Sequence, residues 1–148
     1  MNALSKLLKE SEGRSFEKST SPFHRWLNPV LAKIESGSVV LHYPLRPEMF
    51  NPMNTLHGGL TAAIVDDAVG VALFSLGKEN FHSTIQNTID YLAPVFKQEY
   101  LVVKAYIIKN GKNLVHGRCD IYDEKGQKLL ATGTSNLMDV GIPITLTR

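Results

Sequence analysis

The segment from Asn54 to Gly77, NTLHGGLTAAIVDDAVGVALFSLG, constrains the fold of this chain more than any other part of the sequence. From Gly58 to Leu76 its apolar residues leave no polar face of useful width, so we expect a helix that is buried. At about 1.5 Å per residue, such a helix is about 28 Å long, which is the width of a small domain. The sequence therefore predicts a helix that runs through the middle of the fold.

Two adjacent acids, Asp66 and Asp67, interrupt this apolar helix. An unpaired carboxylate in apolar surroundings costs on the order of several kcal/mol, so one acid either faces a cleft or has a chemical role. The alternative is an ordinary ion pair with a base that is distant in the sequence, such as Arg46 or Lys78. The pattern alone leaves both interpretations open.

The predicted helix is preceded by His57 and begins with Gly58 and Gly59. The first turn of a helix presents unpaired N–H groups and the positive end of the helix dipole. Glycine lacks the Cβ that would keep a ligand away from these groups. The three residues are therefore candidates for an oxyanion or carbonyl site. Alternatively, the two glycines only shape a tight turn into the helix.

Outside this helix, apolar and polar residues alternate with the period of two that is typical of strands. The predicted strands cover residues 30–34, 39–45, 85–91, 101–107, 115–121 and 129–138. The pair Asn110-Gly111 favours a type I′ turn, in which both central residues have positive φ. Strands joined by short turns form an antiparallel sheet. We therefore expect an α+β fold in which an antiparallel sheet wraps around the long central helix.

Composition disfavours several classes of protein. The 148 residues fit a single domain, and a net charge of +2 is too small for a dedicated nucleic-acid binder. The two acids divide the longest apolar run, which disfavours a membrane span, and residues 1–20 lack the apolar stretch of a secretory signal.

Because Cys119 is the only cysteine, no internal disulfide is expected, and the chain is expected to be cytoplasmic. The five histidines lack the i, i+4 spacing of a helical metal site and no G-x-S-x-G occurs, so neither a metal site nor a serine hydrolase is expected.

The stretch NPMNTLHGGLTAAIVDDA, residues 51–68, resembles the signature of hotdog-fold acyl-CoA thioesterases of the phenylacetate-pathway (PaaI) type. In that family an Asn precedes the His of the HGG motif by six residues and an acid follows that His by nine, a spacing that Asn51, His57 and Asp66 match. TIQNTIDYLAP (84–94) and KNGKNL (109–114) are similar to later segments of the family. The resemblance covers residues 30–138 and implies the hotdog fold. We therefore expect an N-terminal helical segment over residues 1–28 and a hotdog domain over residues 29–148.

The resemblance also implies an activity, namely hydrolysis of an acyl thioester of coenzyme A in a cleft between two subunits, without a cofactor. Gly58 N–H would polarise the thioester carbonyl, while Asp66 of the neighbouring subunit acts as base or nucleophile. Asn51 and His57 would position the carbonyl or the attacking water, and Thr84 would orient Asp66 or that water. The residues implied to bind the substrate are Gly59, Tyr91, Lys109, Asn110, Gly111, Lys112, Asn113 and Leu114. The expected assembly is a homodimer or a dimer of dimers (homotetramer).

Several of these residues have plainer interpretations. His57 can make a hydrogen bond at the helix start, Thr84 can be an ordinary strand residue, and Lys109 and Lys112 can be solvated charges on an exposed turn. Asp67 competes with Asp66 for the catalytic role, because only the family spacing selects Asp66.

The whole chain also has alternative interpretations. It can be a catalytically silent acyl-CoA binding protein, or a hotdog dehydratase that acts on acyl chains attached to carrier protein. A DNA-binding regulator is disfavoured, because no helix-turn-helix segment is left over. The sequence does not identify the acyl group, to whose recognition the segment around Phe23 and Trp26 is a candidate contributor.

Overall fold

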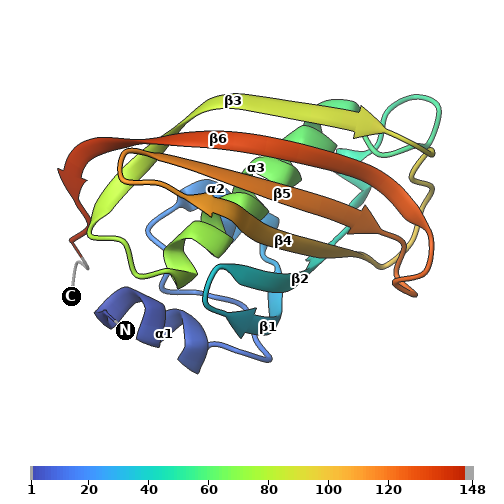
Figure 1. Ribbon diagram of the computed structural model, residues 1–148. Helices are drawn as coiled ribbons and strands as arrows, with labels where there is room; N and C mark the ends of the chain where they lie inside the picture. Colours follow the sequence, from blue (N-terminus) through green and yellow to red (C-terminus); the bar gives the residue numbers. More distant parts are fainter. Residues whose placement is uncertain (1, 146–148) are drawn as a thin grey trace.

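A long helix and a six-stranded antiparallel sheet form the body of the protein in the computed structural model, which describes residues 2–145 (Figure 1). The helix, α3 (Gly58–Ser75), lies against the concave face of the sheet. The strands are β1 (Val30–Glu35), β2 (Ser38–Pro44), β3 (Asn80–Tyr91), β4 (Tyr100–Asn110), β5 (Leu114–Tyr122) and β6 (Leu129–Pro143). Their order across the sheet is β1-β2-β4-β5-β6-β3, so β1 and β3 are its two edges. The predicted α+β arrangement, with the sheet wrapped around a central helix, is confirmed.

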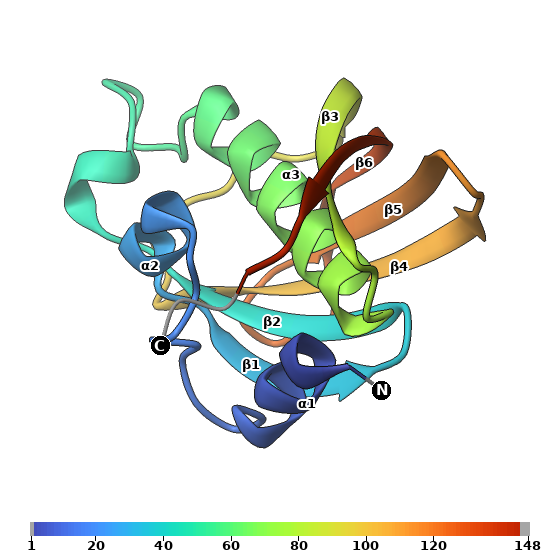
Figure 2. The same ribbon diagram turned by 90° about the vertical axis from the view of Figure 1, so that its left-hand side faces the viewer.

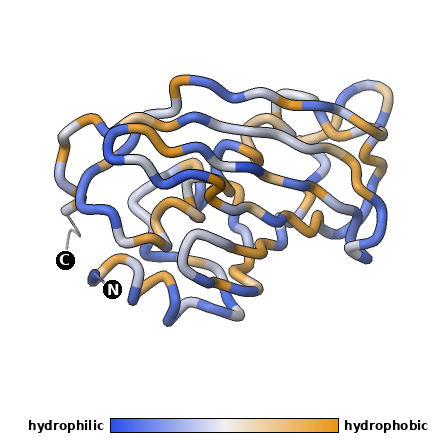
Figure 3. Tube along the Cα trace, viewed as in Figure 1, coloured by the Kyte–Doolittle hydropathy of each residue, from blue (hydrophilic) through white to orange (hydrophobic). Residues whose placement is uncertain are grey.

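The main core lies between α3 and the sheet, and two strand glycines let the helix approach closely. A Cβ at Gly117 of β5 would lie only 2.5 Å from Val69 Cγ1, and a Cβ at Gly133 of β6 would lie 2.9 Å from Val65 Cγ1. Figure 3 shows hydrophobic and hydrophilic residues alternating along the strands, and the buried positions of β5 follow the same period of two. The sequence thus places apolar side chains on one face of the sheet and glycines where the helix comes nearest.

The N-terminal part of the chain forms two short helices, α1 (Ala3–Glu10) and α2 (Pro22–Leu27), beside α3 (Figure 2). Leu8 of α1 and Leu27 of α2 are buried in the same core as the sheet. Between the two helices, the backbone joins β1, since Leu31 N–H donates to the Arg14 carbonyl at 3.0 Å. A 3₁₀ helix, η1 (Pro47–Met49), lies in the connection from β2 to α3. Residues 2–28 therefore pack as part of the domain.

The structure differs from the prediction at two strand ends and one turn. β3 begins at Asn80 rather than at residue 85, and β6 continues to Pro143 rather than ending at residue 138. The prediction of a type I′ turn is wrong, because neither Asn110 nor Gly111 has positive φ. Instead, Gly111 N–H donates to the Leu114 carbonyl at 3.0 Å, and the two residues between them form the turn. The local preference of the Asn-Gly pair gives way to the register that the sheet imposes.

α3 is long and apolar enough to cross a membrane by length and composition, with a mean hydropathy of 1.4 over 18 residues. However, 50% of this stretch is buried inside the protein, and the core helix of a globular fold passes the same test. In this fold α3 is that core helix.

Candidate active site

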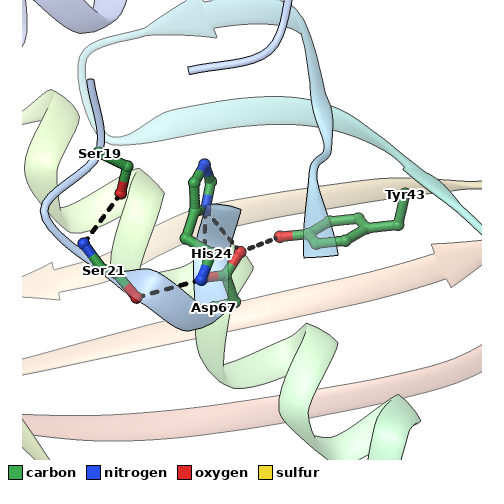
Figure 4. A network of polar contacts seen from close by, with 5 residues as sticks. All are labelled: Ser19, Ser21, His24, Tyr43 and Asp67. Atoms are coloured by element: carbon green, nitrogen blue, oxygen red, sulfur yellow. Dashed lines mark hydrogen bonds and ion pairs between the residues drawn. The ribbon is translucent and has the colours of Figure 1, made fainter. Parts of the chain in front are cut away.

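Asp67 of α3 is held by two residues from other elements (Figure 4). The Tyr43 hydroxyl of β2 donates to Asp67 Oδ2 at 2.7 Å, and His24 Nδ1 of α2 lies 2.9 Å from Oδ2 and 3.2 Å from Oδ1. Because a carboxylate only accepts hydrogen bonds, His24 Nδ1 carries the proton that it shares with Asp67. The side chains of His24 and Asp67 are only 3% and 10% exposed. The predicted alternative, pairing with a base that is distant in the sequence, therefore applies to Asp67, and that base is His24 rather than Arg46 or Lys78.

The local sequence places His24 at this position by capping α2. The Ser21 hydroxyl accepts a hydrogen bond from His24 N–H at 3.1 Å, and the Ser19 hydroxyl accepts one from Ser21 N–H at 3.3 Å (Figure 4). Burial raises the pKa of Tyr43 well above its ordinary value, and the negative charge of Asp67 raises it further. Tyr43 is therefore protonated at neutral pH and donates its hydrogen bond to Asp67.

Asp66, the preceding residue, points to another side of α3, since consecutive helix residues are about 100° apart around the axis. The Thr84 hydroxyl of β3 donates to Asp66 Oδ1 at 2.8 Å. Asp66 is partly exposed. The contact that the resemblance implied between Thr84 and Asp66 is thus present in the structure. One carboxylate oxygen of Asp66 makes no hydrogen bond with residues 2–145.

The start of α3 presents one free N–H group. His57 is the N-cap, and its Nδ1 accepts a hydrogen bond from Gly59 N–H at 3.2 Å, which is the plainer interpretation that the sequence allowed. Leu60 and Thr61 donate to the His57 carbonyl at 2.9 and 3.2 Å. The remaining N–H of this first turn, that of Gly58, has no acceptor among the residues that the structure describes. It is therefore available to a ligand carbonyl.

Tyr91 and Asn51 lie at the same end of α3. The Tyr91 hydroxyl donates to the Gly58 carbonyl at 2.7 Å. Asn51 belongs to the loop before the helix, where its Oδ1 accepts from Met53 N–H at 2.9 Å and its Nδ2 donates to the Thr55 hydroxyl at 2.9 Å. An Asn amide has two N–H donors, so one donor of Asn51 is unused within residues 2–145.

A pocket of about 300 Å³ adjoins the Gly58 end of the helix. It is lined by the last residue of β3, the segment that follows β3 and the start of β6, together with residues near the helix start. The lining residues are Thr55, Leu56, Thr61, Tyr91, Leu92, Ala93, Pro94, Val95, Leu130 and Ala131. The wall is mainly apolar, which suits a chain with few charges.

The hairpin Lys109–Leu114 belongs to the other end of the sheet. Across the strands, Asn110 pairs with Val115, Val115 pairs with Leu137, and Leu137 pairs with Thr84. The Lys78 ammonium donates to the Gly111 carbonyl at 3.1 Å, which ties the hairpin to the C-terminal end of α3. Lys109, Asn110, Lys112, Asn113 and Leu114 are exposed, and Gly111 is partly exposed.

The predicted site residues thus form two groups in one chain. One group surrounds the start of α3 and contains Asn51, His57, Gly58, Gly59 and Tyr91. The other lies further along α3 and contains Asp66 and Thr84 at the middle of the helix and the hairpin 109–114 toward its C-terminal end. Gly58 and Asp66 are eight positions apart on α3, which corresponds to about 12 Å. Tyr91 is seven residues beyond Thr84 on β3, about 23 Å of extended strand.

This separation limits what one chain can do. A carbonyl oxygen within about 3 Å of Gly58 N–H has its carbon far from the Asp66 carboxylate of the same chain. The two groups can therefore act on one thioester only if they come from different subunits. Sequence reasoning missed His24, Tyr43 and Asn87, the last of which donates from β3 to the Ala62 carbonyl of α3 at 3.1 Å.

No three His, Cys, Asp or Glu side chains within residues 2–145 gather closely enough to hold a metal ion. Cys119 is buried, and burial raises the pKa of its thiol far above the ordinary value. The Cys119 thiol is therefore protonated at neutral pH.

The chain is similar to known proteins in both sequence and fold. The model of the thioesterase superfamily matches residues 53–130. Acyl-coenzyme A thioesterase 13 of Homo sapiens is 31% identical over 112 residues, which cover 75% of this chain and 80% of the relative. The protein of the same name from Mus musculus is 35% identical over 112 residues. Among solved structures, the Escherichia coli PaaI protein from the phenylacetic acid degradation operon has a TM-score of 0.80 at 21% identity, covering 97% of this chain and 100% of that chain. A hypothetical thioesterase from Streptococcus pneumoniae, solved with coenzyme A, has a TM-score of 0.72 at 23% identity, covering 79% and 89%.

Proposed function

The chain belongs to the thioesterase superfamily, and we propose that it hydrolyses acyl-CoA at a site shared by two subunits. It is a hotdog-fold thioester hydrolase that converts an aryl or fatty acyl-CoA to the free acid and coenzyme A. We infer the shared site from one observation: the free Gly58 N–H and the Asp66 carboxylate lie far apart on the same helix, α3. Each site takes the first from one subunit and the second from its partner.

The free N–H of Gly58 donates to the thioester carbonyl oxygen and stabilises the negative charge that develops there during attack. In the base route, Asp66 of the partner subunit takes a proton from water as the water oxygen bonds to the carbonyl carbon. The carbon–sulfur bond then breaks, the acid is released, and the thiolate takes up the proton from Asp66. In the nucleophile route, the Asp66 carboxylate attacks the carbonyl carbon, and the carbon–sulfur bond breaks to release the coenzyme A thiolate. Water then hydrolyses the resulting anhydride to the free acid and the Asp66 carboxylate, and the proton released from water goes to the thiolate. Both routes use the carboxylate orientation that Thr84 sets.

Asn51 and His57 support the carbonyl side of this site. The unused N–H of Asn51 can position the carbonyl or the attacking water. His57 keeps the helix start in place through its hydrogen bond with Gly59, so that Gly58 N–H stays free. We assign His57 a positioning role for this reason.

The substrate is bound by both groups of residues. Gly59, Tyr91 and the pocket beside them take the pantetheine arm, which is long and largely uncharged. The exposed hairpin Lys109–Leu114 of the partner subunit takes the nucleotide, since lysines suit phosphate as flexible point charges.

The assembly is a homodimer, or a homotetramer built as a dimer of dimers. β3 is an edge strand whose residues 83–88 are exposed in one chain, and a long open edge invites pairing with another strand. The same side of α3 leaves Gly59, Ala62, Ala63 and Asp66 incompletely covered. A second copy that covers this side also supplies the missing half of each site. A cytoplasmic location fits the single, buried, unpaired cysteine.

Subunit complementation tests the shared site. Gly58→Pro removes the N–H and is compatible with the backbone, because proline is well tolerated at the first position of a helix and His57 already has the extended backbone that precedes proline. Gly58→Pro and Asp66→Asn should each be inactive alone. After mixed refolding, half of the dimers contain one subunit of each kind and have one intact site, so about a quarter of the wild-type activity should return. Activity that stays absent in verified mixed dimers would show that both groups must come from one chain.

A panel of aryl and fatty acyl-CoAs, assayed by release of free thiol, tests the reaction itself. Thiol release is the expected result for at least one acyl class. Tight binding without thiol release across the panel would instead identify a silent acyl-CoA binding protein.

A further inference from the structure

Asn87 is the middle one of three polar side chains that β3 directs at α3. Thr84 contacts Asp66, Asn87 contacts Ala62, and Tyr91 contacts Gly58. The Asn87 amide is oriented by two hydrogen bonds, because Nδ2 donates to the Ala62 carbonyl at 3.1 Å and Oδ1 accepts from the Ser135 hydroxyl. Ser135 is only 1% exposed. The Ala62 carbonyl, which can only accept a hydrogen bond, thus fixes which end of the Asn87 amide is nitrogen.

The amide of Asn87 is only half satisfied by its own chain. An Asn side chain has two N–H donors and two acceptor positions on its oxygen. Within residues 2–145, one donor and one acceptor position of Asn87 are used. The unused N–H and the unused lone pair belong to the same planar amide. A second Asn87 amide can therefore donate to this lone pair and accept from this N–H. Two such amides can form a pair with two parallel N–H···O bonds.

Symmetry determines where Asn87 lies in the dimer, if the shared site of the proposed function is correct. In a two-fold interface, a contact of residue i with residue j is repeated as a contact of j with i. When Gly58 meets the partner's Asp66, and Asp66 meets the partner's Gly58, the residue halfway between them meets its own copy. That residue is Ala62, which is partly exposed and lies beneath Asn87.

We propose that Asn87 lies on the two-fold axis of the dimer, where its amide pairs with that of the partner's Asn87 and fixes the register of the two subunits. A slip of the helices past each other by one turn, about 5.4 Å, would separate Gly58 from the partner's Asp66. It would also break the paired amides and leave polar groups buried without partners. A polar pair at one position of an otherwise apolar interface is a known way to specify register. Asn87 is therefore a positioning residue for both active sites.

Cysteine cross-linking tests the location. Asn87→Cys in a Cys119→Ala background should form a disulfide between subunits under mild oxidation, since a residue on the axis brings its Cβ near that of its copy. Thr88→Cys is the matched control, because Thr88 is the next residue of β3, is exposed, and pairs with Thr134 on the outer face of the sheet. The expected result is a covalent dimer for Asn87→Cys and none for Thr88→Cys. A sample that is dimeric by light scattering and hydrolyses acyl-CoA, but in which Asn87→Cys does not cross-link, would overturn this inference and leave the proposed function intact. If wild-type protein hydrolyses no acyl-CoA, the proposed function fails whatever the cross-linking shows.

A charge substitution tests the pairing. Asn87→Asp keeps the shape but replaces the donor with a carboxylate, so two like charges meet on the axis at neutral pH. The dissociation constant of the dimer, measured by analytical ultracentrifugation, should rise by about tenfold or more. The rise should disappear when the pH is lowered enough to protonate the carboxyl. Thr88→Asp, whose side chain lies on the outer face of the sheet, should raise the dissociation constant much less than Asn87→Asp does. An Asn87→Asp dimer as tight as wild type at neutral pH would show that the two amides do not meet.

Discussion

Asp66 and Asp67 are neighbours on α3, yet their carboxylates are bound by different elements: Thr84 of β3 holds Asp66, and His24 of α2 holds Asp67. The helix turns the two side chains apart, so one acid faces an open side and the other faces the N-terminal segment. Asp67 is paired with a base and a buried hydroxyl, whereas Asp66 has one neutral donor and partial exposure. This difference supports the proposal that Asp66 is the catalytic acid and that Asp67 stabilises the fold.

The two aspartates should therefore respond differently to substitution by Asn. Asp66→Asn should lower kcat by about 10² or more, the range expected for loss of a general base, with little change in stability. Asp67→Asn should keep measurable turnover but lower the free energy of unfolding by about 1–3 kcal/mol, since it removes a buried charged acceptor. Thiol-release kinetics and urea unfolding of both variants provide the check. An active Asp66→Asn beside an inactive, stably folded Asp67→Asn would reverse the assignment.

Deletion of the Gly58 N–H should have a large effect on the chemical step. Gly58→Pro should lower kcat by about 10²–10³, as loss of one oxyanion donor does in other acyl-transfer enzymes. Gly58→Ala is the matched control, because it adds a Cβ at 3.3 Å from the Tyr91 hydroxyl and keeps the N–H. Steady-state kinetics should therefore show a much smaller loss for Ala than for Pro. Equal losses would assign the effect to crowding against Tyr91.

Thr84 should act through its hydroxyl. Thr84→Val keeps the β-branched shape but removes the donor to Asp66, so we expect kcat to fall by about tenfold, the equivalent of one hydrogen bond to a charged group. Thr84→Ser, which retains the hydroxyl, should keep most of the activity. Kinetics of the two variants measure the difference. If Val and Ser variants behave alike, the hydroxyl has no role in orienting Asp66.

Alkaline pH should remove the stability that Tyr43 contributes. The raised pKa of Tyr43 keeps it protonated in the folded state at a pH where an unfolded tyrosine, with a pKa near 10, ionises. Its contribution is therefore complete below about pH 10 and is lost as the pH rises further toward the folded-state pKa. At neutral pH, Tyr43→Phe should be less stable than wild type by about 1.5–3 kcal/mol. The gap should shrink above pH 10 in urea unfolding followed from pH 7 to 11.

Burial also raises the pKa of Cys119, so ionisation of this thiol in the unfolded state likewise lowers the free energy of unfolding at high pH. This contribution is present in both wild type and Tyr43→Phe and cancels in the difference between them. A gap that is constant across the pH range would contradict the assignment to Tyr43.

Lys109 and Lys112 should affect substrate binding rather than the chemical step. Replacing both with Ala should raise KM for acyl-CoA several-fold with little change in kcat, because the hairpin is exposed and lies outside the reacting groups. The difference from wild type should diminish as salt is added, since exposed charges are screened. Kinetics at low and high ionic strength give the test. Lys125→Ala, on the opposite turn of the sheet, serves as a control that should change neither constant.

The sequence predicted the elements well because their signals are local. The apolar pattern of residues 58–76 and the period of two in the strands identified α3 and the sheet, and the family resemblance implied the contact of Thr84 with Asp66. The partner of Asp67 was not predictable, because His24 lies 43 residues away and no local pattern links them. The type I′ turn predicted at Asn110 and Gly111 was wrong because distant strand pairing determines the backbone there. A bulge between Ile107 and Lys109 and the pairing across the whole sheet set the register there, and they override the preference of two residues.

The hydrogen bond between His24 and Asp67 also determines which N-terminal residues a shortened protein must keep. The match to the superfamily begins at residue 53, and the first strand begins at Val30, so residues 2–28 could be mistaken for a dispensable leader. A fragment that starts at β1 would keep the nearly buried Asp67 carboxylate on its central helix and lose the hydrogen bond that His24 makes to it. Shortened or fused versions of this protein should therefore keep α2 intact.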